Sequence, residues 1–166
     1  MGARAGLVEG FAVKASPIIV FVVTYALFLV SGFLFRIDFA YYYALAKPSF
    51  TPPGSAIGLV WAVLFACISL AVALLDAKIG IANVGWLVGG ALVANWFFNQ
   101  AYSYIQFTRK EWLFATFDSA LVALTAIAFI ALVWRLSRPS ALLLVPYAAW
   151  ATFATYLSYA IWALNR

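Results

Sequence analysis

The sequence has no histidine, one cysteine (Cys67) and one methionine, which is its first residue. A zinc site needs several Cys or His ligands, and a disulfide within the chain needs two cysteines. Without histidine neither a Ser–His–Asp triad nor a Cys–His pair can form, and a haem iron is left with only Tyr or Cys67 as axial ligand. No glycine-rich phosphate loop occurs either. The sequence therefore excludes hydrolysis and phosphoryl transfer, and it predicts no metal site and no required cofactor.

Charged residues are scarce as well. They make up 9% of the chain, against 67% hydrophobic residues, and the mean hydropathy is +1.04. A soluble domain is nearer half apolar and a quarter charged, so this composition predicts a protein that resides in a lipid bilayer. The net charge of +5 is spread over the polar hinges on both sides of the membrane. It gives no orientation by the positive-inside rule, and it lacks the clustered basic face of a nucleic-acid binder.

Five apolar runs are long enough for helices that cross a membrane, which takes about 20 residues each. They cover residues 17–35, 54–75, 79–107, 112–134 and 139–165. These runs are continuous, whereas the strands of a membrane barrel alternate in polarity. The sequence predicts an all-α integral membrane protein with a single domain over residues 17–166, a five-transmembrane-helix bundle, after an N-terminal tail over residues 1–16.

The third predicted span ends in a stripe of polar side chains. At 100° per residue, Asn95, Asn99, Tyr102 and Gln106 fall within about 60° of one another on a helix. Amides that faced lipid would lack hydrogen-bond partners, so the stripe must face protein or a cavity. Two uses remain open: hydrogen bonds between helices, as is common for Asn and Gln in bundles, or one wall of an internal pocket.

Aromatic residues are abundant, with seven Trp, nine Tyr and fifteen Phe. Anchoring at the membrane interface accounts for tryptophans near span ends, but less well for Trp61 and Trp150, which lie inside spans. Trp61 and Phe65 share one face of the second span, and Trp150 and Ala154 share one face of the fifth. These two faces are predicted to complete the pocket.

Asp118 is the only charged residue inside a predicted span. An ionisable group at such a position faces the bundle interior and finds a partner, so Asp118 either ties helices together or contacts a ligand. The first loop contains AYYYALAKPSFTPPG over residues 40–54, in which three prolines stiffen the backbone. Because this loop joins the same side of the membrane as the polar end of the third span, we predict that it is a lid over a pocket.

The start of the third run is rich in small residues. Gly85, Gly89, Gly90 and Ala94 form two small-xxx-small pairs that lie away from the polar stripe. Small residues let helices approach closely in lipid. They predict a homodimer interface, with close packing inside one protomer as the alternative.

Four motifs resemble the TspO/translocator protein family, also called tryptophan-rich sensory proteins. They are KPSFTPPG (47–54), the IGLVW that ends at Trp61, ANWFFNQ (94–100) and PYAAWATFATYLSYAIW (146–162). The resemblance covers about residues 17–165, with the motifs in the family's order. It implies a five-helix protein of the bacterial cell membrane, usually homodimeric, that binds porphyrins and other tetrapyrroles; animal relatives also bind cholesterol and benzodiazepine-type drugs. Carried over by motif, the pocket would be lined by Tyr42, Pro52, Trp61, Phe65, Asn95, Asn99, Gln106, Asp118, Trp150 and Ala154.

The sequence departs from the family pattern at three places. Phe50 stands where the lid commonly has Trp, and Asn99 and Gln100 stand where the third helix often has prolines. In the proposed cholesterol motif, Leu157 and Tyr159 fit but Arg166 lies too far along the chain. The sequence therefore predicts a more polar pocket, and it gives no basis for predicting sterol specificity.

Three functions are compatible with this resemblance. The first is a membrane receptor or regulator in which a porphyrin, or a drug-like molecule, stacks between Trp61 and Trp150. The second is an enzyme that degrades protoporphyrin to a bilin-like product with light and oxygen; there the porphyrin is photosensitiser and substrate, and Trp61 and Trp150 match the tryptophans implicated in catalysis. The third, a transporter of a tetrapyrrole or another small molecule, is disfavoured because the sequence shows neither an inverted repeat nor a relay of ionisable groups.

Overall fold

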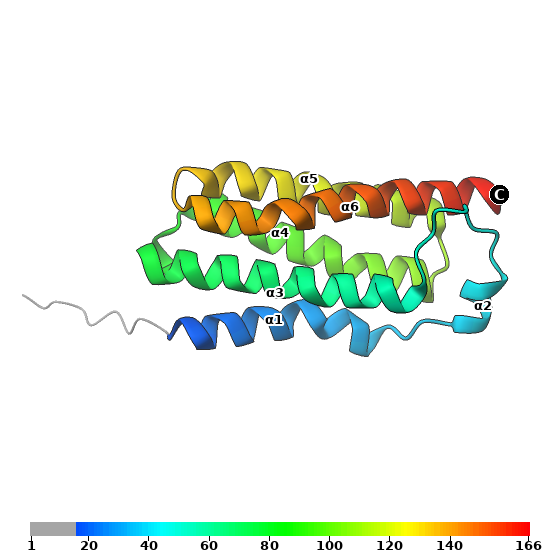
Figure 1. Cartoon of the computed structure of the whole chain (residues 1–166), viewed down its shortest axis with the longest axis horizontal. Helices are drawn as coiled ribbons and strands as arrows, with labels where there is room; N and C mark the ends of the chain where they lie inside the picture. Colours follow the sequence, from blue (N-terminus) through cyan, green and yellow to red (C-terminus); the bar gives the residue numbers. More distant parts are fainter. Residues whose placement is uncertain (1–15) are drawn as a thin grey trace, which may run out of the picture.

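The computed structural model describes residues 16–166, so the predicted tail over residues 1–16 lies outside the described residues apart from Ser16. Its elements are α1 (Pro17–Leu34), α2 (Phe39–Ala44), α3 (Gly54–Ile79), the short 3-10 helix η1 (Ile81–Asn83), α4 (Trp86–Ser103), the π-helical segment η2 (Tyr104–Thr108), α5 (Trp112–Trp134) and α6 (Arg138–Leu164). Figure 1 shows the long helices side by side, with α2 at one end of the bundle. Every regular element in the described residues is helical, which confirms the all-α prediction.

Four helices, α1, α3, α5 and α6, are long and apolar enough to cross a membrane by length and composition. The fifth long helix, α4, does not reach that hydropathy although it has 18 residues. The polar residues Asn95, Asn99 and Gln100 lower the mean hydropathy of α4. The predicted count of five spans is therefore not confirmed, and the described chain has six α-helices because the first loop contains α2.

The turn between α3 and α4 lies later than the sequence predicted. The hinge expected around residues 76–78 is helical, and α3 continues to Ile79. The chain turns between Gly80 and Gly85, whose φ angles of 80° and 81° are readily adopted by glycine. The Asp76 carboxylate fixes this turn by accepting a hydrogen bond of 2.7 Å from the Ile81 N–H. Because apolar residues flank Gly80, the run from residue 79 looked like the start of a span.

This later turn also corrects the predicted small-residue face. Gly85 is the N-cap of α4 rather than part of the helix, so Gly85 and Gly89 do not form a helical pair. Gly89, Gly90 and Ala94 remain on α4, and an added Cβ at Gly89 or Gly90 would meet nothing within 4 Å. That part of α4 presents an open, small-residue surface.

The helices pack as neighbouring pairs around an apolar core. α1 packs against α3 and α4, α3 packs against α6, and α5 packs against α4 and α6. Phe28, Ile68, Phe129 and Leu144 are among the fully enclosed core side chains. The outer faces carry exposed apolar side chains such as Phe33, which is 80% exposed. Lipid solvates such side chains, so outward apolar faces suit a membrane-embedded bundle.

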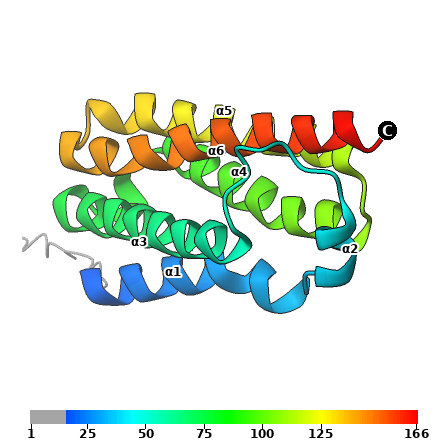
Figure 2. The same cartoon turned by 45° about the vertical axis from the view of Figure 1, so that its right-hand side comes forward.

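The first loop and α2 cover one end of the bundle. Figure 1 shows the segment from α2 to the start of α3 at the end of the bundle that holds the C-terminus, and in Figure 2 this segment passes in front of α6 and α4. The Asp38 side chain caps α2 by accepting a hydrogen bond from the Tyr41 N–H. At the same end α4 runs on into the π-helical η2, an irregularity that frequently marks functional sites.

Candidate ligand-binding pocket

A cavity of about 320 Å³ lies inside the bundle at the end that the first loop covers. Its volume falls within the usual range for small-molecule sites. Side chains from α1, α2, α3, α4, η2, α5 and α6 all contribute to its lining. Seven of the ten residues predicted to bind ligand line it, namely Tyr42, Trp61, Phe65, Asn99, Gln106, Trp150 and Ala154.

The other three predicted residues, Pro52, Asn95 and Asp118, are not among the lining residues. Asn95 is 2% exposed, and its amide nitrogen donates to the Val122 carbonyl at 2.9 Å and to the Thr125 hydroxyl at 3.0 Å. It therefore ties α4 to α5. Asp118 is buried in α5 beside the cavity wall, and its Oδ2 has no hydrogen-bond partner among the described residues.

The polar stripe on α4 serves both of the uses that the sequence left open. Tyr147 of α6 donates its hydroxyl to Asn95 Oδ1 at 3.0 Å and accepts from Asn99 Nδ2 at 3.3 Å. Tyr102 pairs with the Ser158 hydroxyl at 2.8 Å. Asn95 acts between helices, whereas Asn99, Tyr102 and Gln106 also form one wall of the cavity.

A second polar face of α4 was not predicted. Trp96 Nε1 donates to the Leu27 carbonyl at 2.9 Å, and Gln100 Oε1 accepts from the Ser31 N–H at 2.8 Å. The Ser103 hydroxyl lies 3.3 Å from that of Ser31. Trp96, Gln100 and Ser103 follow i, i+4, i+7 spacing, a helical signal that was available in the sequence. This face binds α4 to α1 and holds α1 against the cavity.

Aromatic rings form the opposite walls. The Trp61 ring on α3 lies 5.6 Å from the Phe65 ring and 6.0 Å from the Tyr147 ring, centroid to centroid. On α6 the Trp150 ring lies 5.2 Å from the Phe153 ring. These contacts hold both indoles in place at the cavity surface.

Two atoms of the lining lack hydrogen-bond partners within residues 16–166. They are the acceptor Gln106 Oε1 and the donor Trp150 Nε1, both buried. A buried polar atom without a partner is costly, by about 1–3 kcal/mol. A ligand that supplied one donor and one acceptor here would remove that cost.

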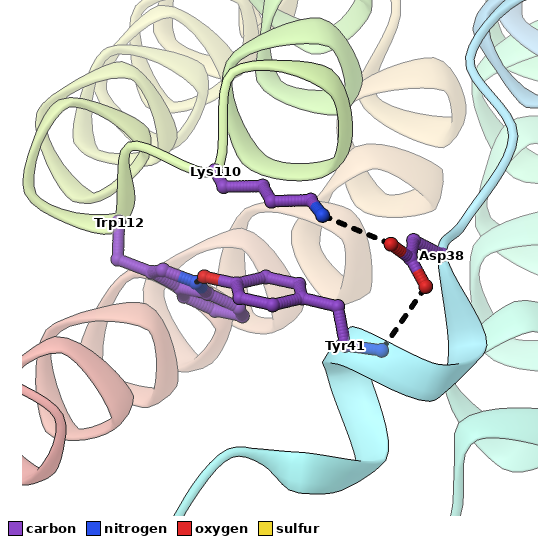
Figure 3. Close-up of polar contacts among 4 residues, drawn as sticks. All are labelled: Asp38, Tyr41, Lys110 and Trp112. Atoms are coloured by element: carbon purple, nitrogen blue, oxygen red, sulfur yellow. Dashed lines mark hydrogen bonds and ion pairs between the residues drawn. The ribbon is translucent and has the colours of Figure 1, made fainter.

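The lid is fastened to the bundle by a polar cluster, shown in Figure 3. Asp38 Oδ2 forms an ion pair of 2.9 Å with Lys110 Nζ, and Trp112 Nε1 donates to the Tyr41 hydroxyl at 2.9 Å. Lys110 Nζ also lies 4.4 Å from the centre of the Tyr41 ring. The Tyr41 N–H, and then Lys110, lower the pKa of Asp38 by stabilising its carboxylate. Lys110 has a φ of 59°, which is uncommon outside glycine.

A second fastening joins the lid to the end of α6. Asn165 accepts a hydrogen bond from the Ala46 N–H at 3.0 Å and donates one to the Ala46 carbonyl at 2.8 Å. Phe50 of the lid stacks on Tyr156 of α6 with ring centroids 5.5 Å apart. Tyr42 reaches from α2 into the cavity, and burial raises the pKa of its phenol. The lid is therefore attached to both α5 and α6.

A bundle of apolar, membrane-length helices with an aromatic and polar cavity beneath a fastened loop is the architecture of an integral membrane protein with a pocket for a small molecule. The chain belongs to the TspO/MBR family, whose profile matches residues 18–163. Family membership supports a role as a membrane receptor or regulator.

The chain is similar to several proteins of that family. It is 48% identical over 153 residues to "Tryptophan-rich protein TspO" of Bacillus cereus, an alignment that covers 92% of this chain and 98% of the relative. "Uncharacterized membrane protein YtaB" of Bacillus subtilis is 46% identical over 79% of this chain and 84% of its own length. The human "Translocator protein" is 31% identical over 83% of this chain and 82% of its own length. With its apolar helices and bacterial relatives, the chain is an integral membrane protein of the bacterial membrane.

Proposed function

We propose that this protein is a membrane receptor or regulator that binds a porphyrin in the cavity beneath the first loop. One observation carries the proposal: two indoles on different helices, Trp61 and Trp150, line one cavity whose third side is polar. A porphyrin is a flat apolar macrocycle with polar pyrrole nitrogens and carboxylate side chains. Aromatic walls suit its faces, and a polar wall suits its nitrogens and carboxylates.

The polar atoms of the lining suit such a ligand. Gln106 Oε1 can accept a hydrogen bond from a pyrrole N–H, and Trp150 Nε1 can donate one to a carboxylate. Asn99 Nδ2 bonds Tyr147 at 3.3 Å, a long hydrogen bond that a bound ligand can replace.

Titration of purified protein with protoporphyrin, followed by quenching of tryptophan fluorescence, tests the proposal. We expect saturable binding to wild type and weaker binding to Asn99→Leu, by roughly 1–3 kcal/mol if the amide meets a buried ligand group. Asn83→Leu, a change in the turn at the other end of the bundle, is the matched control and should bind as wild type does. If Asn99→Leu binds protoporphyrin with unchanged affinity, the ligand binds at a different site.

A second candidate function is light- and oxygen-dependent degradation of protoporphyrin. The placement of Trp61 and Trp150 on the same cavity favours it, because an indole beside an excited porphyrin can exchange an electron with it. Illumination of the complex in air separates the two functions. A bilin-type absorbance band above a control without protein supports an enzyme, and stable porphyrin absorbance supports a receptor alone.

For the assembly we propose five spans and a homodimer. α4 and η2 together are about 34 Å long at roughly 1.5 Å per residue, enough to cross a hydrocarbon core of about 30 Å. Gly89, Gly90 and Ala94 leave an open face on α4, and small residues let a partner helix approach closely. Gly85 lies outside the helix and is not part of this proposal.

A further inference from the structure

A second, polar depression lies at the end of the bundle opposite the lid. It is lined by Lys78, Trp134, Arg135, Leu136, Arg138 and Pro139. These residues come from the C-terminal end of α3, the end of α5 and the start of α6, which meet at the left of Figure 1. The depression shares no lining residue with the cavity beneath the lid.

The depression is basic and its cations have no acidic partner in the described part of the chain. Lys78, Arg135 and Arg138 are exposed, and the ion pair found within residues 16–166 joins Lys110 to Asp38 at the other end. Asp76 is the acidic residue nearest to Lys78 in sequence, but it is 2% exposed and accepts from the Ile81 N–H. Lys78 Nζ donates to the Leu136 carbonyl at 2.7 Å, which holds the ammonium group beside the two arginines.

Apolar side chains lead away from the depression along two helices. On α3, Leu70 and Leu74 precede Lys78 at i−8 and i−4, and they are 43% and 38% exposed. On α6, Leu142 and Val145 follow Arg138 at i+4 and i+7, and they are 58% and 45% exposed. α3 packs against α6. Each stripe thus begins four residues from a cation that lines the depression, on one of two helices that pack together, and runs away from this end of the bundle.

We propose that this depression binds the phosphate of an anionic phospholipid, with its acyl chains along the two stripes. Arginine guanidinium groups bind phosphate oxygens through paired hydrogen bonds, and lysine adds a point charge. Trp134 lies at the rim, where indoles favour the headgroup region. Free inorganic phosphate shares the headgroup chemistry, but it has no group that would contact the exposed leucines.

Native mass spectrometry of the protein with equal amounts of phosphatidylglycerol and phosphatidylcholine tests the proposal. We expect wild type to retain phosphatidylglycerol preferentially. Each basic residue near an anionic surface contributes about fivefold, so Arg135→Gln with Arg138→Gln should reduce that preference by roughly thirtyfold. Arg36→Gln with Arg109→Gln removes the same charge at the lid end and should leave the preference unchanged. Equal retention of both lipids by wild type, or an equal loss in both double variants, overturns the proposal.

Two further measurements distinguish a lipid from free phosphate. Leu74→Ser with Leu142→Ser keeps all three cations but removes apolar contacts, and it should lower retention of phosphatidylglycerol. Excess inorganic phosphate should not displace the lipid from wild type. Full displacement of the lipid by phosphate would mean that the depression binds phosphate itself. The same conclusion would follow if the serine variant retained phosphatidylglycerol as well as wild type does. Thermal unfolding monitors the fold of each variant. If Arg135→Gln with Arg138→Gln does not fold, the single change Arg135→Gln replaces it and should reduce the preference for phosphatidylglycerol by about fivefold.

Discussion

The hydroxyl of Tyr147 joins two amides of α4 across the middle of the bundle. It donates to Asn95 and accepts from Asn99, and the Tyr147 side chain is 1% exposed. In a medium without water such a network stabilises the fold only when each polar atom has a partner. Tyr147 therefore links the structural part of the polar stripe to the part that lines the cavity.

Replacing Tyr147 by Phe should destabilise the protein by about 1–3 kcal/mol, because it leaves buried amide groups unpaired. Thermal unfolding in detergent measures the effect as a lower Tm. Tyr159→Phe is the matched control, since Tyr159 is 50% exposed, and its Tm should not change. Equal unfolding temperatures for Tyr147→Phe and wild type would mean that the network contributes nothing.

The sequence predicted which face of the helix carries these side chains, but not how deep in the bundle each of them lies. Helical spacing placed Asn95 and Asn99 of α4 on one side with Gln106 of η2, yet Asn95 bonds α5 and does not line the cavity. The same limit applies to Asp118. A helical wheel has no information on how far along the membrane normal a cavity extends, because that depends on which residues of the neighbouring helices leave space.

Among the secondary-structure elements, the lid formed by the first loop and α2 contributes Phe39 and Tyr42 to the lining of the cavity. It is attached by the Asp38–Lys110 ion pair, the Trp112–Tyr41 hydrogen bond and the Asn165–Ala46 pair. Trp112 is buried and lines the cavity, whereas the Asp38–Lys110 ion pair and the Asn165–Ala46 hydrogen bonds lie at the surface. Weakening them should change how fast a ligand exchanges more than how tightly it binds.

Asp38→Asn should accelerate porphyrin release and entry by a few-fold with little change in Kd, as measured by stopped-flow fluorescence. The Tyr41 N–H, and then Lys110, hold the Asp38 pKa below its ordinary value of 3.8, so the carboxylate fastens the lid above that pH. As the pH falls through the lowered pKa, the fastening is lost and wild-type release should approach the rate of the variant. A release rate for Asp38→Asn equal to that of wild type at neutral pH would show that the ion pair does not hold the lid; Arg36→Gln is the control.

Several elements could be predicted from the sequence, and others depended on local backbone geometry. The range predicted for α5, residues 112–134, matches the structure, because charged or turn-forming residues flank a long apolar run. The later turn at Gly80 and Gly85 was missed, since apolar residues continue through it. α2 was missed as well, although Asp38 three residues before Tyr41 is a capping signal for a short helix.

The molecule as a whole has distinct surfaces on α4. One face bonds α1, a second lines the cavity with Asn99 and Tyr102, and a third carries the small residues Gly90 and Ala94. Because these faces are separate, assembly through the third need not disturb the cavity.

Gly90→Leu with Ala94→Leu should therefore convert the proposed homodimer into monomers that still bind porphyrin. Light scattering in detergent gives the protein mass, and the fluorescence titration gives the affinity. Ala128→Leu with Ala131→Leu, which places two leucines at exposed positions of α5 that do not line the cavity, is the control and should remain dimeric. A double variant that stays dimeric would place the interface on another surface.

The most direct test of protoporphyrin binding between Trp61 and Trp150 is to measure the protoporphyrin affinity of two double tryptophan variants. Trp61→Leu with Trp150→Leu removes both indoles from the cavity, whereas Trp86→Leu with Trp134→Leu removes two exposed indoles at the other end of the bundle. The first pair should bind protoporphyrin at least roughly tenfold more weakly than wild type, because each lost aromatic contact contributes about 0.5–1.5 kcal/mol beyond its buried area. The second pair should bind as wild type does. Wild-type affinity in the first pair, or a matching loss in the second, would contradict a porphyrin site in this cavity.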